Sequence, residues 1–492
     1  MSRLLRFVLL PLAAAQFFPA VPHLTSFNSS FAFTQAQIAS AEIGANLTET
    51  LQNIINFDRS QLAFVSQSTI PSTPTNSTQG GPNHDTFYTP PPVSAIPPPG
   101  TLLSLQSPTD PTPYTVPPLT ALSRLLYTTQ TYNGTTIPTS GFLLLPYLPR
   151  PVSSQKKPKI PLVIWTHGTS GFFAPSAPSS NRGLWYETSA LYPLVEAGYA
   201  VFAPDYAGLG VSHDWNGTRI RHQYLSSPAG ANDALYGLLA ARKAFPDLFT
   251  EEFVVAGHSQ GGGVAWAVAE ALATKKWGDV KGYKGTVAAS PTTEVFGVEG
   301  TFSAPTVGQG VGTVFSGFEL GRWLTEFGER RWKVIEEVEG GIALVQRLFF
   351  GVEGLLRKGW NETWEVKEWS RLMNVGGRRF EGPLLVLQGD EDFYVAYETT
   401  KKTVERTWEV FPRGDLEFYV ARGVGHTPVL HATQVYWLKW IGERFDGKTV
   451  KKGGFTTEVK GLLPKEWYQK FKFALSLWTG LPEFQYETAA AF

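Results

Sequence analysis

The 492-residue sequence contains no cysteine and has no excess of charge of either sign. The lack of cysteine excludes a disulfide framework, a cysteine nucleophile and a cysteine-ligated metal site. Lysine plus arginine and aspartate plus glutamate number 42 each, so net charge gives no electrostatic case for nucleic acid or an anionic membrane as the main partner. No apolar run reaches the roughly 18 residues that span a bilayer. A chain this long can bury a core that folds without disulfides.

The first fifteen residues have the pattern of a secretory signal peptide. Arg3 and Arg6 form a positive region, residues 7–12 are apolar, and the three alanines at 13–15 form a small-residue cleavage site. N-x-S/T sequons occur at Asn28, Asn46, Asn76, Asn133, Asn216 and Asn361. Together these features predict a secreted protein that passes through a glycosylating pathway.

The most informative motif is G-H-S-Q-G at residues 257–261, which follows an apolar run at 253–256 and precedes a helical pattern at 264–273. A strand, a G-x-S-x-G turn and a helix in this order are typical of a hydrolase nucleophile. The turn is so tight that the positions two before and two after the serine need glycine, and Gly257 and Gly261 meet that need. The motif predicts Ser259 as the nucleophile. Taken alone, it is also compatible with an ordinary glycine-rich turn.

A candidate catalytic acid follows a second apolar run, L-L-V-L-Q-G at residues 384–389. Catalytic groups of open α/β sheets gather at the carboxyl ends of the strands. The spacing G-x-x-D-x-x-V favours Asp392, and Asp390 and Glu391 are rival candidates. A carboxylate at this point could instead serve only as a turn or helix cap.

A candidate base, His426, follows a third apolar run at residues 416–421 and a glycine-rich loop. A serine hydroxyl needs an imidazole to accept its proton, and the imidazole needs a carboxylate to orient it. The alternative, His431, lies beyond Pro428 and is expected inside the next helix. The chain order is therefore Ser259, Asp392, His426.

An early strand at residues 160–166 ends in His167, Gly168 and Thr169. Such a turn supplies one donor of an oxyanion hole, and the N–H of the residue after the nucleophile, here Gln260, supplies the other. We predict the N–H of Thr169 as the partner donor, with Gly168 as the alternative. His167 and His258 are expected to be structural.

Continuous apolar runs alternate with helical patterns, as in a parallel sheet covered on both faces. The expected buried strands are 162–165, 199–204, 253–257, 285–290, 384–388 and 416–421. An antiparallel hairpin is expected at 122–146, with Asn133-Gly134 at its turn. After residue 290 this rhythm breaks: a glycine-rich stretch at 297–317 leads into a helical, aromatic-rich stretch at 322–373. This insertion predicts a helical cap or lid over the site, with a structural helical subdomain that does not gate the site as the alternative.

These patterns predict six regions. They are a signal peptide (1–15), an N-terminal arm with a Pro/Ser/Thr-rich segment (16–102), a first core part (103–290), a cap or lid insertion (291–379), a second core part (380–445) and a C-terminal extension (446–492).

Together these motifs resemble the α/β-hydrolases of the secretory lipase family, which includes bacterial and fungal secreted lipases. The similarity spans roughly residues 86 to 445, with T-H-G-T-S-G at 166–171, A-G-Y-A-V-F-A-P-D-Y-A-G-L-G at 197–210 and G-H-S-Q-G-G at 257–262. It implies an α/β-hydrolase fold with a mostly parallel sheet, flanking helices and a helical cap. It also implies nucleophile, acid and base roles for Ser259, Asp392 and His426, whose order is that of α/β-hydrolases. The family often has a cysteine after the H-G-T-x-G turn, whereas residues 172–178 have none.

The sequence therefore predicts a secreted serine hydrolase that cleaves acyl esters of small molecules or lipids without a metal or organic cofactor. The lysines and aromatic residues of the C-terminal extension favour a docked terminal segment with solvated lysines, and a transient contact with a lipid surface is the alternative. Nucleic acid is not expected as a partner. Two alternatives remain at this stage: a serine peptidase of the prolyl aminopeptidase type, and a hydrolase-fold binding protein without catalysis. Oligomeric state has no signal in the sequence.

Overall fold

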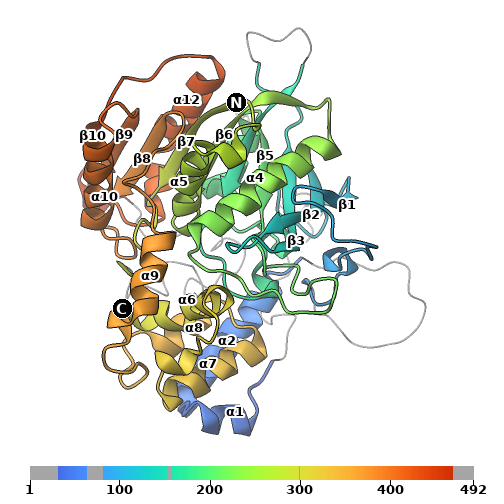
Figure 1. Ribbon diagram of the computed structural model, residues 1–492, viewed down its shortest axis with the longest axis vertical. Coiled ribbons are helices and arrows are strands. Elements are labelled where there is room, and N and C mark those ends of the chain that lie inside the picture. The colour runs from blue at the N-terminus through green and yellow to red at the C-terminus, as the bar shows by residue number, and fades with distance from the viewer. Residues whose placement is uncertain (1–30, 64–80, 152–157, 298–299, 469–492) are drawn as a thin grey trace, which may run out of the picture.

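A single mixed sheet forms the centre of the molecule (Figure 1). The computed structural model describes residues 31–63, 81–151, 158–297 and 300–468, so the expected signal peptide and the sequons at Asn28 and Asn76 lie outside the described residues. Ten strands follow the order β1-β2-β3-β5-β4-β6-β7-β8-β9-β10 within these ranges. The strands are β1 Leu102–Gln106, β2 Ala121–Gln130, β3 Thr136–Leu145, β4 Ile160–Thr166, β5 Ala200–Pro204, β6 Phe249–His258, β7 Tyr283–Ala289, β8 Leu384–Gly389, β9 Leu416–Ala421 and β10 Phe455–Val459.

The sheet has an antiparallel edge and a parallel main part. β2 and β3 pair antiparallel as the predicted hairpin, with Gly134 at a φ of 84° in the turn between them. β3 pairs antiparallel with β5, and every pair from β5 to β10 is parallel. The central strands β4, β5 and β8 are buried along their whole length, because both of their faces are covered. The predicted α/β-hydrolase fold class is confirmed.

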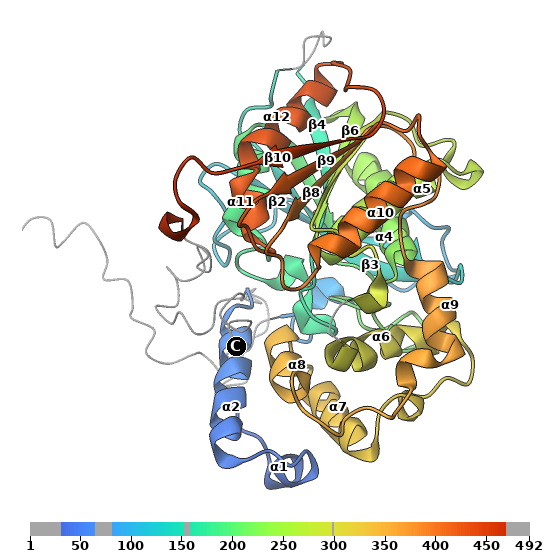
Figure 2. The same cartoon turned by 90° about the vertical axis from the view of Figure 1, so that its left-hand side faces the viewer.

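Two layers of helices cover the sheet (Figure 2). The helices are α1 Gln35–Ser40, α2 Ala45–Ser60, α3 Leu191–Glu196, α4 Ser227–Ala244, α5 Gln260–Leu272, α6 Gly300–Val314, α7 Glu326–Val338, α8 Ile342–Phe349, α9 Trp364–Met373, α10 Tyr397–Val410, α11 Pro428–Ala432 and α12 Gln434–Phe445. Helices α4, α5 and α10 share one apolar cluster with the sheet, and α3, α11 and α12 share another. In the described residues no helix combines the length and apolar character that crossing a bilayer requires.

The insertion between β7 and β8 is helical, as predicted, and its helices α6 to α9 have their own apolar core. We call residues 291–379 the cap. The helical part begins earlier than the sequence suggested, because α6 occupies most of the glycine-rich stretch. Here glycine allows close packing: a Cβ on Gly308 would overlap the Leu320 side chain, and one on Gly310 would come within 3.2 Å of the Trp369 ring. Tertiary contact therefore outweighs the poor helix propensity of glycine.

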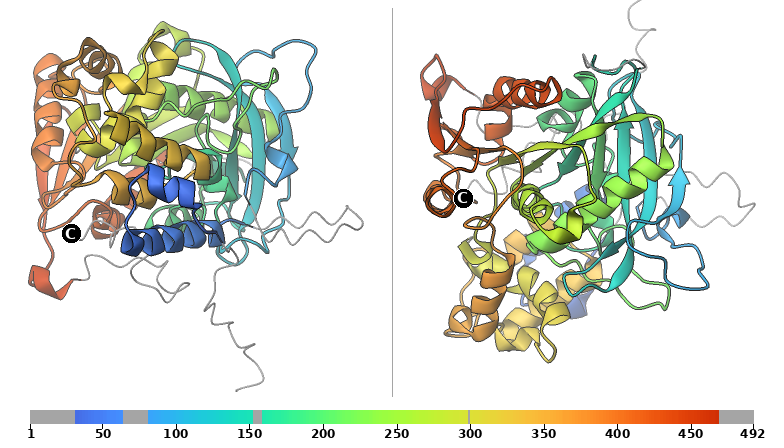
Figure 3. Two further views of the ribbon diagram at one scale, coloured as in Figure 1. Left: turned by 90° about the horizontal axis from the view of Figure 1, so that it is seen from below. Right: turned by 45° about the horizontal axis from the view of Figure 1, so that its top comes forward.

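Two N-terminal helices pack against the cap (Figure 3). Helix α1 starts with a capping box between Thr34 and Gln37. The buried Arg331 on α7 donates from Nε to the carbonyl of Ala41 at 3.1 Å and from Nη1 to the carbonyl of Leu348 at 2.7 Å. One guanidinium thus joins the end of α1 to the cap helices α7 and α8.

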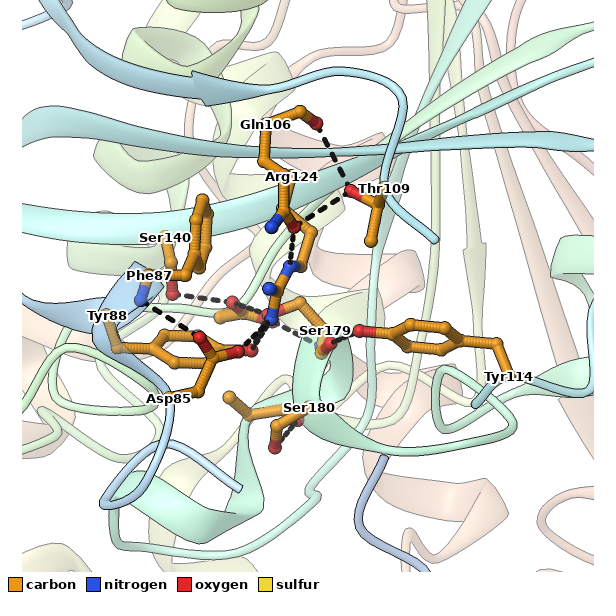
Figure 4. Close-up of polar contacts among 12 residues, drawn as sticks. Asp85, Phe87, Tyr88, Gln106, Thr109, Tyr114, Arg124, Ser140, Ser179 and Ser180 are labelled. Atoms are coloured by element: carbon orange, nitrogen blue, oxygen red, sulfur yellow. Dashed lines mark hydrogen bonds and ion pairs between the residues drawn. The ribbon is translucent and has the colours of Figure 1, made fainter. Parts of the chain in front are cut away.

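In the described residues, the proline-rich segment lies against the body of the protein and contains the short helical turn Thr86–Tyr88 and the strand β1. Its main attachment is Arg124 on β2, whose side chain is 1% exposed (Figure 4). Arg124 Nη1 lies 2.6 Å from Asp85 Oδ2, and Nε donates to Gln106 Oε1 at 2.7 Å. Tyr88 and Ser179 share a hydrogen bond of 2.8 Å that continues the network into the loop after β4.

The C-terminal region adds an edge strand to the sheet. β10 pairs parallel with β9, and Arg422 bonds to Asp390 on one side and to Glu458 of β10 on the other. The described part of the C-terminal extension is therefore docked on the main body.

Replacing Arg124 with leucine should destabilise the protein by about 3–5 kcal/mol, because the Asp85 carboxylate, whose side chain is only 11% exposed, loses its charged partner. Replacing both Arg124 and Asp85 with leucine should cost less than Arg124→Leu alone. Urea-unfolding midpoints measure the effect. The control is Arg371→Leu, which breaks an exposed pair with Glu368 and should change stability by less than about 1 kcal/mol. Equal midpoints for Arg124→Leu and Arg371→Leu would contradict the role of Arg124.

Candidate active site

Ser259 lies on a strained turn between β6 and α5. Its backbone has φ 58° and ψ −122°, a conformation that costs a non-glycine residue about 1–3 kcal/mol. Both glycines of the motif are enclosed: a Cβ on Gly257 would overlap Thr166 Oγ1, and one on Gly261 would overlap the Thr166 carbonyl oxygen. The close approach of β4 therefore requires glycine at both positions. The Ser259 side chain remains partly exposed at the start of a helix.

The predicted oxyanion loop lies directly against this turn. A Cβ on Gly168 would come within 3.1 Å of Ser259 Cβ, so the loop after β4 borders the serine. Thr169 follows on that loop, and Gln260 is the first residue of α5. Their N–H groups therefore come from two segments that flank Ser259, the arrangement that an oxyanion hole needs.

Asp392 follows β8 and is fully held by hydrogen bonds. Oδ1 accepts from the N–H groups of Tyr394 and Val395, both at 2.9 Å, and Oδ2 accepts from Gln388 Nε2 at 3.0 Å. Burial alone would raise the pKa of Asp392, but the adjacent His426, the Val395 N–H and the Ser290 side chain keep the pKa below its usual value. The carboxylate is therefore charged at neutral pH.

His426, in the loop after β9, contacts that carboxylate. Nδ1 lies 2.8 Å from Asp392 Oδ2. Because an ionised carboxylate only accepts, Nδ1–H is the donor, which leaves Nε2 as the basic nitrogen. The rivals have other partners: Asp390 accepts from the N–H of Gly423 at 2.6 Å, and Glu391 pairs with Lys465 at 2.9 Å. His431 lies on α11, as expected, and contacts Ser189 at 3.2 Å.

His258, next to the serine, bridges the two halves of the site. Nε2 lies 3.0 Å from the carbonyl oxygen of His426, and Nδ1 lies 2.5 Å from the Tyr186 hydroxyl. Burial lowers the pKa of His258 to about 3, so the ring is neutral. A carbonyl only accepts, so Nε2–H donates to His426 and Nδ1 accepts from Tyr186. The ring centroids of His258 and His426 are 4.5 Å apart, which places the loop of His426 beside the Ser259 turn.

Sequence reasoning did not identify several supporting residues. Gln388 could have been identified from the sequence, because it is a polar residue at the end of an otherwise apolar buried strand. Tyr394 had none: its ring packs 5.3 Å from that of His426, and its hydroxyl accepts a 3.4 Å bond from Gln346 on the cap helix α8. The cap therefore contacts the pair of Asp392 and His426 through Tyr394.

A second serine, histidine and aspartate also lie together, but their bonds differ. Ser179 Oγ donates directly to the buried Asp205 carboxylate at 2.5 Å, and Ser140 Oγ donates to it at 2.6 Å. The ring nitrogens of His167 face backbone carbonyls of Gly168 and Asp205 at 2.7 and 3.3 Å. Since no imidazole lies between Ser179 and the carboxylate, this group lacks the relay that activates a serine. It holds the loops after β4 and β5 together.

Comparisons with known proteins agree with the fold described above. Residues 163–436 match the profile of the alpha/beta hydrolase family. Among solved structures, Candida antarctica lipase A is similar to 77% of the chain over 90% of its own length, with 16% identity and a TM-score of 0.61. Its closed state matches with 15% identity and a TM-score of 0.60, covering 75% of this chain and 88% of its own.

A rice cell wall degrading esterase, LipA from Xanthomonas oryzae, is 16% identical, with a TM-score of 0.51 over 70% of this chain and 97% of its own. At these identities the likeness concerns the fold. No curated protein matches the sequence significantly.

The neutral state of His258 predicts a specific dependence of stability on pH. Its folded pKa of about 3 lies below the unfolded value of about 6.5. The stability that neutral His258 contributes is therefore complete above pH 6.5 and is lost as pH falls toward 3. His258→Asn cannot titrate, so the stability advantage of the wild type over this variant should shrink by about 2 kcal/mol between pH 7.5 and pH 5.

Urea unfolding at the two pH values measures this difference. Tyr186→Phe, which keeps the titrating ring, serves as the control and should retain most of the pH dependence. An advantage over His258→Asn that is the same at both pH values would contradict a buried, neutral His258.

Proposed function

The chain belongs to the alpha/beta hydrolase family, and from that premise we propose that it is a serine hydrolase that cleaves carboxylic esters. One observation carries the proposal. The strained Ser259 turn and the hydrogen-bonded pair of Asp392 and His426 lie at the ends of strands in one sheet, joined through His258. A binding protein would not need this combination of a strained serine, an oriented imidazole and a buried carboxylate.

In the proposed reaction Ser259 Oγ attacks the ester carbonyl carbon and transfers its proton to His426 Nε2. Asp392 accepts from Nδ1–H, which fixes the tautomer and stabilises the imidazolium. His426 then protonates the leaving alcohol, which leaves an acyl group on Ser259. Water, deprotonated by His426, releases the acid and restores the enzyme. The residues perform these steps without a cofactor.

Oxyanion stabilisation is assigned to the backbone N–H groups of Gln260 and Thr169, with Gly168 as the glycine that lets the loop approach the serine. The N-terminus of α5 adds its partial positive charge at the same point. Gly257 and Gly261 are the residues that make the turn.

Esters are the proposed substrates for two reasons. The solved structures with this fold include a lipase and an esterase. The loop after β4 also carries Phe172 and Phe173, which are buried in the apolar cluster of the cap. An apolar cap beside the serine suits an acyl chain and excludes water from the acyl-enzyme. We propose residues 291–379 as this covering element between the core parts 103–290 and 380–445.

Secretion is part of the proposal. It is supported by the signal-peptide pattern at residues 1–15 and by the sequons within the described residues, all of which are exposed: Asn46, Asn133, Asn216 and Asn361. Phe393, next to Asp392, is 69% exposed, and Trp467, two residues after the Lys465 that pairs with Glu391, is 73% exposed. These apolar side chains suit a transient contact with a lipid surface.

The proposal is tested by hydrolysis of p-nitrophenyl esters from C2 to C16. Ser259→Ala should lower kcat by roughly 10⁶-fold, as removal of a triad serine does, and should abolish labelling by a fluorophosphonate. The chain-length profile then separates an esterase from a lipase.

Ser179→Ala is the matched control. Its hydroxyl faces Asp205 without an imidazole, so this variant should still be labelled at Ser259. Ester turnover that survives Ser259→Ala, or labelling that is lost with Ser179, would refute the assignment. Turnover of aminoacyl amides without turnover of esters would instead identify a peptidase.

A further inference from the structure

The segment between β5 and α4 contacts the cap on one side and the oxyanion loop on the other. We call residues 221–226, which precede α4, the strap. Neighbouring side chains alternate in what they contact. His222 and Tyr224 bond to residues beside Ser259, whereas Arg221 and Gln223 bond to the cap. Each side of the strap therefore has its own set of polar partners.

On the site side, His222 holds the side chain of Gln260. Gln260 Nε2 lies 3.1 Å from His222 Nε2, and His222 Nδ1 lies 3.0 Å from the Ala207 carbonyl oxygen. Burial lowers the pKa of His222 to about 4, so the ring is neutral. Its single proton belongs on Nδ1, which faces a carbonyl, and Nε2 therefore accepts from the Gln260 amide. The ring also stacks on Tyr206, with centroids 5.9 Å apart.

Tyr224 holds the second oxyanion residue. Its hydroxyl lies 2.9 Å from Thr169 Oγ1, and its ring makes an edge contact with Phe172, with centroids 5.0 Å apart. Tyr224 is 5% exposed, so the tyrosine side of this bond is buried, whereas Thr169 is partly exposed. Thus both residues whose N–H groups are assigned to the oxyanion hole are bonded through their side chains to one short segment.

On the other side, the cap fixes the strap. Arg221 Nη1 lies 3.0 Å from Glu336 on α7, and Gln223 Nε2 donates to Thr313 Oγ1 on α6 at 2.7 Å. The backbone is constrained as well: Leu225 has a φ of 56°, and a Cβ on Gly208 would overlap the backbone nitrogen of His222. A strained segment persists only where its surroundings determine its position.

We infer that His222 and Tyr224 are positioning residues of the oxyanion hole, which they hold through the side chains of Gln260 and Thr169. This inference rests on the proposed function, because it assigns a role in the same reaction. An oxyanion hole acts only if its donors stay within about 0.5 Å of the productive geometry. The two donors lie on separate segments, the loop after β4 and the N-terminus of α5. The strap bonds to both segments and so fixes their relative position.

A double-mutant cycle tests the Tyr224 arm. The variants are Tyr224→Phe, Thr169→Val and the double variant, each assayed for kcat and KM with the best p-nitrophenyl ester. Each single change should lower kcat about tenfold, less than the roughly 10²–10³-fold loss of a complete donor, with KM within about twofold. Because both changes remove the same bond, the double variant should also lose about tenfold.

Affinity for a trifluoromethyl ketone, which forms a tetrahedral adduct with the serine, provides a second readout and should fall in parallel with kcat. A variant that only destabilises the fold would not lose affinity for the adduct in proportion to its loss of kcat. Tyr236→Phe is the matched control, since it removes a tyrosine hydroxyl bonded to Gln130, and should leave kcat unchanged. Thr169 is only partly buried, so Thr169→Val tests the same bond should Tyr224→Phe fail to fold.

The His222 arm is tested by rescue. His222→Leu removes the acceptor of the Gln260 amide and should lower kcat about tenfold, whereas His222→Gln offers a side-chain oxygen and should restore part of it. Two results would overturn this inference and leave the proposed function intact. One is a loss near 100-fold in the double variant, which means that the two changes act independently. The other is a kcat for Tyr224→Phe within twofold of the wild type. Absence of Ser259-dependent turnover in the wild type would overturn the proposed function, and this inference with it.

Discussion

The close approach of β4 to the turn after β6 is the constraint on which the site depends. Thr166, the last residue of β4, lies so near the turn that neither Gly257 nor Gly261 could carry a side chain, and its hydroxyl donates to the Gly261 carbonyl at 2.8 Å. The sheet pairs Thr166 with Gly257. This pairing forces Ser259 into its strained conformation and also places the loop of Gly168 and Thr169 beside the serine.

The polar side chains around this turn keep the same protonation states at neutral pH. The buried rings of His167, His222 and His258 all have lowered pKa values because of burial, so they remain neutral where an ordinary histidine would begin to protonate. Neutral rings keep constant donor and acceptor roles. Among the groups of the site, the carboxylate of Asp392 carries the permanent charge, and it is matched by four hydrogen-bond donors.

Much of this arrangement could be predicted from the sequence, because it depends on local patterns. Each apolar run predicted a buried strand, and the structure places Ser259, Asp392 and His426 in the segments that directly follow three of those strands. The contacts that join these segments are not local. Tyr186 reaches His258 across 72 positions and His222 reaches Gln260 across 38, and no periodicity marks such pairs. The helix α6 was not predicted because glycine has a poor helix propensity. Its glycines are accommodated in a helix only because large neighbouring side chains pack closely against them.

The packing of the N-terminal helices on the cap has a consequence for biosynthesis. The bond between Ala41 and Arg331 joins residues 290 positions apart. At about 5–20 residues per second, a ribosome needs roughly 15–60 s to make the partner of α1 and α2 after these helices emerge. Their apolar faces stay uncovered during this interval, longer than an isolated helix needs to form and unfold many times. Helices α1 and α2 therefore wait for most of the length of the catalytic core to be made before the cap can cover them.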